Sequence, residues 1–112
     1  MMTSITDLSY LKEIASGDDD FISEVIQTFI HQVPKFTGNM RKYLKSGEYL
    51  RLAKEAHTAK SSVIIFGMNG LAIKLKELQL LAENQHKTET YPEYIDEFEQ
   101  LCKQAIKELK SL

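Results

Sequence analysis

Apolar residues recur every three or four positions along most of this chain, and that spacing restricts the possible folds more than any other feature. The longest run begins at Ile22, ends at Leu44 and lines one side of a predicted helix of about six turns. Its members are Ile22, Val25, Ile26, Phe29, Val33, Phe36, Met40, Tyr43 and Leu44. The chain has no run that strictly alternates apolar and polar residues, and no internal repeat at a fixed period. The pattern therefore predicts an all-α fold.

Helix-breaking and helix-capping residues divide the first half of the chain. The apolar segment 8–15 predicts a short first helix, which Gly17 ends. Asp18–Asp20 follow, and carboxylates at a helix N-terminus accept free backbone N–H groups and suit the helix dipole. Pro34 lies inside the second helix, where it predicts either a kink or a break. Gly47 is placed as the C-terminal stop of that helix.

Three further helices are expected in the second half. Two of them cover about residues 48–66 and 71–84, and a polar loop follows. The last helix opens with a predicted capping box, in which Thr90 accepts from the first turn and Glu93 returns the contact. Pro92 fits a first turn, where its missing N–H has no partner to lose. The apolar stripe of this helix comprises Tyr94, Phe98, Leu101, Cys102, Ala105, Leu109 and Leu112.

The length and composition fit a single domain that spans residues 1–112. Hydrophobic residues make up 43% of the chain and charged residues 27%, which is an ordinary globular balance. A chain of this size can bury a core without disulfides or metals. Because short connections join the four longer helices, we predict an antiparallel up-and-down four-helix bundle with a short additional N-terminal helix.

Several classes of function are disfavoured by the same sequence. A formal net charge of −2 gives no polybasic surface, so we expect no binding to nucleic acid or to membranes. No apolar run approaches the roughly 20 residues of a membrane span, and residues 1–7 lack a signal-peptide pattern, which predicts a cytoplasmic protein. The single cysteine, Cys102, excludes an internal disulfide framework and reads as a core residue. His31 and His86 lack neighbouring metal ligands, so no bound metal or cofactor is expected.

The third predicted helix carries the most chemical information. Its core stripe comprises Leu52, Ala56, Ala59, Val63 and Phe66. At 3.6 residues per turn, His57 lies roughly 135° from the centre of that stripe and points away from the core. The residues expected within roughly 60° of it on the helix surface are Leu50, Ala53, Lys60, Ser61 and Ile64.

This arrangement has a chemical use. Neutral imidazole is a nucleophile near pH 7, and a lysine one turn along brings a positive charge near a phosphoryl oxygen. A small residue at the fourth position leaves room above the ring, and an apolar rim lets a partner dock. A surface histidine near a lysine is common, however, so the bare pattern leaves an ordinary solvated helix face as an open interpretation.

The segment from Ala56 to Gly67 resembles the signature of histidine-containing phosphotransfer (HPt) domains. That signature has a phosphorylated histidine followed at fixed spacings by a lysine, small or hydroxyl residues, an apolar residue and a glycine. The matching residues here are His57, Lys60, Ser61, Ser62, Phe66 and Gly67. Downstream, Leu71, Leu75, Leu78 and Gln79 are similar to the next helix of the family. The resemblance covers nearly the whole chain.

The resemblance implies a role for each matching residue. His57 would accept a phosphoryl group through Nε2, and Lys60 would neutralise phosphoryl charge. Gln79 would hydrogen-bond the imidazole at Nδ1, which fixes the tautomer and leaves Nε2 free. Ser61 is either a permissive small residue beside the ring or a donor to the phosphate. Ser62 is expected to bond back to a backbone carbonyl.

The resemblance also implies the partners. HPt domains exchange phosphoryl groups with receiver domains of response regulators or of a hybrid sensor histidine kinase, and the receiver supplies the Mg²⁺. This chain has no nucleotide-binding motif, so it is expected to lack autokinase activity. Nothing indicates obligate oligomerisation, so a monomer is expected, and the Met1-Met2 start favours a free-standing protein. The alternative is a non-catalytic helical adaptor that binds a signalling partner.

Two positions depart from the family pattern. Val63 stands where a smaller residue is usual and Ala59 where a larger one is usual, and repacking of the core is expected there.

The surface that receivers would contact is predicted from apolar residues placed off or at the edge of the core stripes: Ile14, Phe21, Val25, Leu50 and Ile64. For Ile14, simple packing of the first helix over the bundle end remains open.

Overall fold

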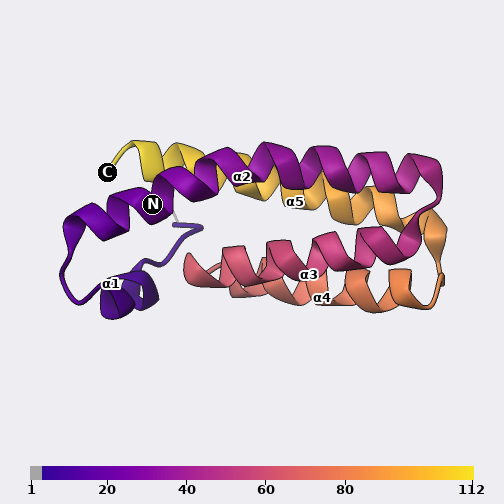
Figure 1. The fold of residues 1–112 in the computed structure, drawn as a ribbon, viewed down its shortest axis with the longest axis horizontal. Helices are drawn as coiled ribbons and strands as arrows, with labels where there is room; N and C mark the ends of the chain where they lie inside the picture. The colour runs from indigo at the N-terminus through magenta and orange to yellow at the C-terminus, as the bar shows by residue number, and fades with distance from the viewer. Residues whose placement is uncertain (1–3) are drawn as a thin grey trace.

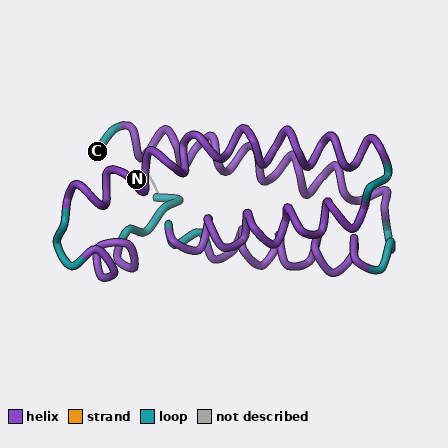
Figure 2. Tube along the Cα trace, in the orientation of Figure 1, coloured by secondary structure: helices purple, strands orange, loops and turns teal. Residues whose placement is uncertain are grey.

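In the computed structural model, residues 4–112 are described, and over this range the protein is all-helical, which confirms the predicted class. The helices are drawn in Figures 1 and 2. They are α1 (Ser9–Ala15), α2 (Asp19–Ser46), α3 (Tyr49–Ile65), α4 (Asn69–Glu83), the short 3₁₀ helix η1 (Thr88–Thr90) and α5 (Tyr91–Lys110). No strand occurs among these residues.

The four long helices lie along the long axis of the molecule, which measures 43 × 29 × 19 Å. Figure 1 shows α2 beside α5 along one edge and α3 beside α4 along the other, with the chain direction reversing at each connection. The most extensive contact between two helices is that of α3 with α4. Helix α1 lies at one end, under the start of α2.

The predicted ends of α2 are confirmed. Asp18 is its N-cap, where Oδ1 accepts from the backbone N–H of Phe21 at 3.1 Å. Gly47 ends the helix in the left-handed conformation, with φ of 71°. A break at Pro34 does not occur, because α2 is one helix of 28 residues with Pro34 inside it. Proline removes one backbone hydrogen bond, while the buried Val33 and Phe36 on either side hold both halves against the core.

The predicted capping box at the start of α5 is wrong. Thr90 makes no cap hydrogen bond to α5, because it belongs to the preceding 3₁₀ turn with helical backbone angles. Its hydroxyl donates instead to the carbonyl of Lys87 at 2.7 Å. The buried Tyr91 anchors this connection, since its hydroxyl lies 2.8 Å from the carbonyls of both Leu81 and His86. Pro92 does lie in the first turn of α5, as predicted.

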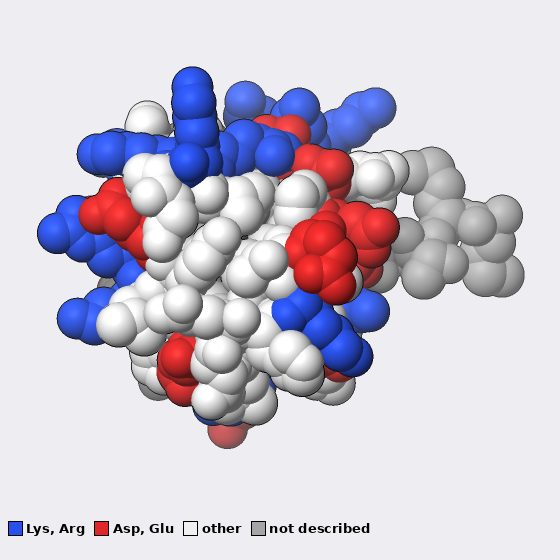
Figure 3. Space-filling model, turned by 90° about the vertical axis from the view of Figure 1, so that its right-hand side faces the viewer, with Lys and Arg blue, Asp and Glu red and all other residues white. Residues whose placement is uncertain are grey.

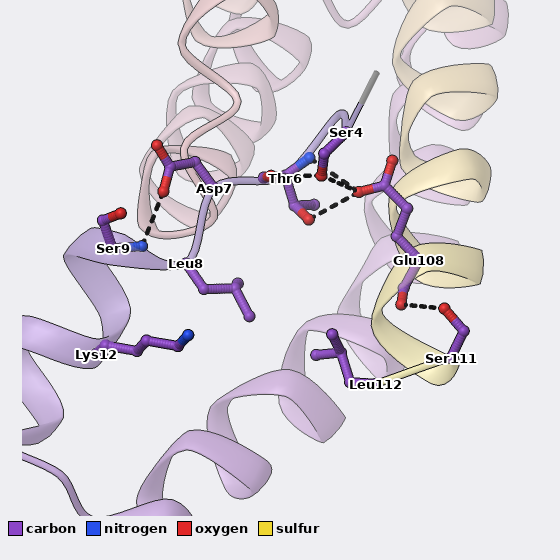
Figure 4. A pocket seen from close by; sticks show the side chains of 9 residues that line it. All are labelled: Ser4, Thr6, Asp7, Leu8, Ser9, Lys12, Glu108, Ser111 and Leu112. Atoms are coloured by element: carbon purple, nitrogen blue, oxygen red, sulfur yellow. Dashed lines mark hydrogen bonds between the residues drawn. The ribbon is translucent and has the colours of Figure 1, made fainter. Parts of the chain in front are cut away.

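The segment before α1, residues 4–7, is hydrogen-bonded both to α5 and to the turn that follows α3. Glu108, near the end of α5, accepts from the backbone N–H groups of Ile5 at 2.7 Å and Thr6 at 3.1 Å. It also accepts from the hydroxyls of Ser4 and Thr6, as Figure 4 shows. Partial burial by itself raises the pKa of Glu108, but these hydrogen bonds outweigh it and lower the pKa to about 2.

The same segment explains the glycine between α3 and α4. The N–H of Asp7 donates to the carbonyl of Phe66 at 2.9 Å, which brings the N-terminal segment against the turn between α3 and α4. Gly67 has φ of 71°, and a Cβ there would lie 2.6 Å from the Cβ of Asp7. Only glycine fits this position. Helix α4 then begins at Asn69, two residues earlier than the sequence predicted.

The core is a continuous apolar cluster to which every α-helix contributes. The predicted α3 stripe is confirmed, since Leu52, Ala56, Ala59, Val63 and Phe66 are all buried. Phe66 meets Phe29 of α2 with ring centroids 4.4 Å apart. Cys102 is fully buried as predicted, and burial raises the pKa of its thiol to about 12, which leaves it unreactive.

The charged surface is mixed rather than of one sign. Figure 3 views the end that carries the α2–α3 and α4–α5 connections, where Lys and Arg side chains gather along one edge and acidic side chains lie among them. In the described part of the chain, no helix combines the length and apolarity that crossing a bilayer requires.

Candidate functional site

His57 is exposed on α3 at the edge that faces α4. It lines a cleft of about 530 Å³ between the two helices. The other residues of this cleft are Leu50, Ala53, Lys54 and Thr58 of α3, with Gln79 and Glu83 of α4. The cleft therefore joins a nucleophilic ring, a lysine, an amide and a carboxylate.

Small residues in α3 explain why the two helices lie so close. Ala53, Ala56 and Ala59 are buried, and short side chains at a helix–helix contact reduce the distance between the axes. The sequence placed Ala53 beside His57 on the helix surface, and both residues line the cleft. The burial of Ala53 was not predicted: helix α4 covers that edge of α3, so Ala53 forms the floor of the cleft.

The imidazole is held by a side chain from α4. Nδ1 of His57 lies 3.2 Å from Oε1 of Gln79, which is the contact that the family resemblance implies. Nε2 of Gln79 donates in turn to Oε1 of Glu83 at 2.8 Å. An ionised carboxylate only accepts, so the amide must present its NH₂ to Glu83 and its oxygen to the ring. Nδ1 then carries the proton, and Nε2 keeps its lone pair.

Lys60 and Ser61 lie one turn beyond the ring. Lys60 is half-buried, does not line the cleft, and no ion pair within residues 4–112 engages its ammonium group. Ser61 is exposed, and its hydroxyl donates to the backbone carbonyl of His57 at 3.4 Å. Ser61 therefore engages the helix backbone and leaves space beside the ring.

The expectation for Ser62 is wrong. Its hydroxyl donates to Oε1 of Gln32 on α2 at 3.5 Å, not to a backbone carbonyl of its own helix. Ser62 is half-buried where α3 faces α2, so a partner on the neighbouring helix is within reach.

The predicted docking residues are spread over three helices. Ile14, Phe21, Leu50 and Ile64 have exposed fractions between 39% and 60%, and Val25 is half-buried. Leu50 and Ile64 flank His57 along α3, each about 10 Å away at 1.5 Å per residue. Ile14, Phe21 and Val25 belong to α1 and the first turns of α2, near the end of α3 that carries Ile64. Packing of α1 over the bundle end falls to the buried Leu11 and Ala15, not to Ile14.

Three exposed residues of α4 were not singled out from the sequence. Glu83 was missed, although it follows Gln79 by four positions and therefore shares its helix face. Two exposed apolar residues of α4, Ile73 and Leu80, were also missed. Both are apolar but lie between the core positions of α4, and apolar residues outside the core stripe are the signal that could have identified them.

The other two histidines lie in different surroundings. Nδ1 of His31 is 2.8 Å from the carbonyl of Gln27, one turn earlier in α2, and His86 is exposed in the α4–α5 connection. Among residues 4–112, no three His, Cys, Asp or Glu side chains group closely enough to hold a metal ion.

No family model, curated protein or solved structure matches this chain.

Proposed function

We propose that this protein is a phosphorelay intermediate of the HPt type. In this proposal its four long helices form the antiparallel up-and-down bundle of that family, and His57 is the phosphoacceptor. The observation that carries the proposal is the exposed imidazole whose Nδ1 is hydrogen-bonded by Gln79, because this contact leaves Nε2 as a free nucleophile. The twelve-residue resemblance around His57 supplies the reaction class.

The reaction is a reversible phosphoryl transfer. The Nε2 lone pair attacks the phosphorus of an aspartyl phosphate in line, an N–P bond forms, and the P–O bond to the aspartate breaks. The leaving carboxylate keeps the electron pair and remains on the receiver domain with its Mg²⁺. The Nδ1 proton stays in place, so the Gln79 oxygen faces a ring that has become cationic. Attack by the aspartate of a second receiver reverses these steps.

The neighbouring residues support that chemistry. Lys60 has no ion-pair partner in the described chain, so its ammonium group is available to phosphoryl oxygens. Ser61 bonds to the backbone and leaves room for the incoming group. The apolar side chains of Ile14, Phe21, Val25, Leu50 and Ile64 are assigned to receiver docking, in which the partner excludes water from the transfer.

The proposed setting follows from these partners. The protein acts in the cytoplasm as a monomer, it binds receiver domains rather than nucleic acid or lipid, and it carries the phosphoryl group without a cofactor of its own. Mg²⁺ is supplied by the receiver.

A transfer assay tests the proposal. Receiver domains from the same genome are charged with a radiolabelled small phosphodonor and Mg²⁺, then mixed with the wild-type protein or with His57→Gln. The matched controls are His31→Gln and His86→Gln, which remove exposed imidazoles elsewhere on the surface. Acid-labile label on the wild type and on both controls, but not on His57→Gln, is the expected result.

The adaptor alternative predicts a different outcome. The exposed apolar side chains on α1, α2 and α3 would also suit a protein that only binds a partner. In that case receivers would bind the wild type and His57→Gln equally, no label would move, and signalling in the cell would survive the substitution. This combination of results would overturn the phosphorelay proposal.

A further inference from the structure

We infer that Glu83 is a positioning residue that sets the tautomer and orientation of His57 through Gln79. The inference rests on the proposed function, because it concerns how the phosphoacceptor is prepared for attack. It extends the site from one hydrogen bond to a chain of two, which runs from a carboxylate through an amide to the ring. The three residues come from two helices, with His57 on α3 and the other two on α4.

The direction of this chain follows from the chemistry of its members. Glu83 accepts from Nε2 of Gln79 at 2.8 Å, the shorter of the two contacts and the one that involves an ionised group. Without that carboxylate, the amide is free to turn over and present its NH₂ to the ring. Nδ1 would then have to accept, and the proton would move to Nε2, the atom that must attack. Glu83 thus selects the reactive tautomer although it does not touch the ring.

The position of Glu83 in its helix supports a role beyond folding. It is the last residue of α4, where the helix dipole is negative and an acidic side chain is unfavourable. Its side chain is exposed, and within residues 4–112 its only hydrogen bond is to Gln79. An acidic residue at this place therefore contributes little to the stability of α4, and the orientation of Gln79 is what it provides.

The tautomer can be measured directly. In protein labelled with ¹⁵N at histidine, long-range proton–nitrogen NMR spectra distinguish a protonated Nδ1 from a protonated Nε2 at each ring. We expect His57 of the wild type to be mainly protonated at Nδ1 when neutral. In Glu83→Ala we expect a substantial population protonated at Nε2. His31 is an internal reference, because its Nδ1 faces a carbonyl in both proteins.

Two further variants separate position from charge. Glu83→Gln keeps an oxygen that can accept from Gln79 but loses the charge, so an intermediate tautomer population is expected. Glu77→Ala is the matched control, since Glu77 is an exposed acidic residue of α4 that accepts from Tyr94 rather than from Gln79. It should leave the His57 signals unchanged. Unaltered amide spectra away from the cleft would show that each variant is folded.

The transfer rate gives the second readout. Phosphoryl transfer to Glu83→Ala is expected to be about fivefold slower than to the wild type, the equivalent of one typical hydrogen bond. An unchanged His57 tautomer in Glu83→Ala would overturn this inference and leave the phosphorelay proposal intact. A wild type that accepts no label from any receiver would overturn the proposed function instead, whatever the tautomer spectra show.

Discussion

Single side chains decide what the α3–α4 edge can do. His57 is reactive in our account because one nitrogen is engaged by Gln79 and the other is not. Side chains in an α-helix tilt toward the N-terminus of the helix, so each one lies over the turn before its own Cα atom. This tilt determines which neighbours on α3 can approach the ring of His57. From this geometry we expect Lys60, one turn after His57, to extend back toward the ring, and Lys54, one turn before it, to extend away from the ring although it lines the cleft.

This geometry predicts that the two lysines differ. Lys60→Ala should slow phosphoryl transfer from a receiver roughly tenfold, the equivalent of one charge-assisted hydrogen bond to the phosphoryl group. Lys54→Ala should change the rate by less than about twofold, since it only lines the cleft. Single-turnover transfer rates at saturating receiver check both values. Equal effects of the two substitutions would contradict the placement.

Gly67 is a position that should not tolerate a side chain. Its positive φ and the approach of Asp7 predict that Gly67→Ala lowers the free energy of unfolding by about 2–4 kcal/mol. Gly38→Ala is the matched control, because nothing lies within 4 Å of a Cβ there and the helix should gain about 0.5–1 kcal/mol. Urea unfolding followed by circular dichroism measures both, and a loss at Gly67 no larger than about 1 kcal/mol would argue against the close approach.

At the scale of elements, the sequence predicts helix ends that depend on neighbouring residues, but it does not predict contacts between residues far apart in the chain. The Asp18 cap and the Gly47 stop follow from neighbouring residues alone, and both are present. The capping box at Thr90 fails because the residues before it form a 3₁₀ turn held by Tyr91, a contact that no local pattern reveals. Local patterns also do not reveal the hydrogen bonds from Ile5 and Thr6 to Glu108, here called the Glu108 clamp, because these residues lie more than 100 positions from Glu108.

The contact between α2 and α5 contains a hydroxyl without a partner. Thr37 is buried, and its Oγ1 has no hydrogen-bond partner among the described residues. Thr37→Val removes that polar atom at similar volume, so we expect the free energy of unfolding to rise by about 1 kcal/mol. Thr28→Val, on the exposed part of α2, should change it by less than about 0.5 kcal/mol. Thermal and urea unfolding check this, and destabilisation by Thr37→Val would mean that the hydroxyl is satisfied.

The Glu108 clamp gives the N-terminal segment a pH dependence. Its pKa is about 2 in the folded protein and near the ordinary value of 4.5 when unfolded. A lowered folded pKa means that the stabilisation is complete above about pH 5 and is lost as the pH falls toward 2. The difference in unfolding free energy between the wild type and Glu108→Gln should therefore shrink over this range. A difference that stays constant from pH 7 to pH 2.5 would contradict the clamp.

For the whole molecule, the periodicity of apolar residues was sufficient for the all-α class and for the buried stripe of α3, because burial follows directly from helix geometry. The position of α4 was not available from that pattern. It buries Ala53, opens the cleft beside His57 and brings Gln79 within reach of the ring. The apolar stripe of α3 was thus predictable from its own periodicity, and the contact between Gln79 and His57 from the family resemblance. The burial of Ala53 depends on the packing of α4 against α3 and needed the three-dimensional arrangement.

The most direct test of the account is the position of the phosphoryl group on the imidazole. The protein is labelled with ¹⁵N at histidine, phosphorylated by a charged receiver domain and studied by phosphorus–nitrogen NMR under alkaline conditions that preserve phosphohistidine. We predict a single phosphorylated ring, His57, with the phosphorus bonded to Nε2 and Nδ1 still facing Gln79. Phosphate on Nδ1 of His57, or on His31 or His86, would contradict the account.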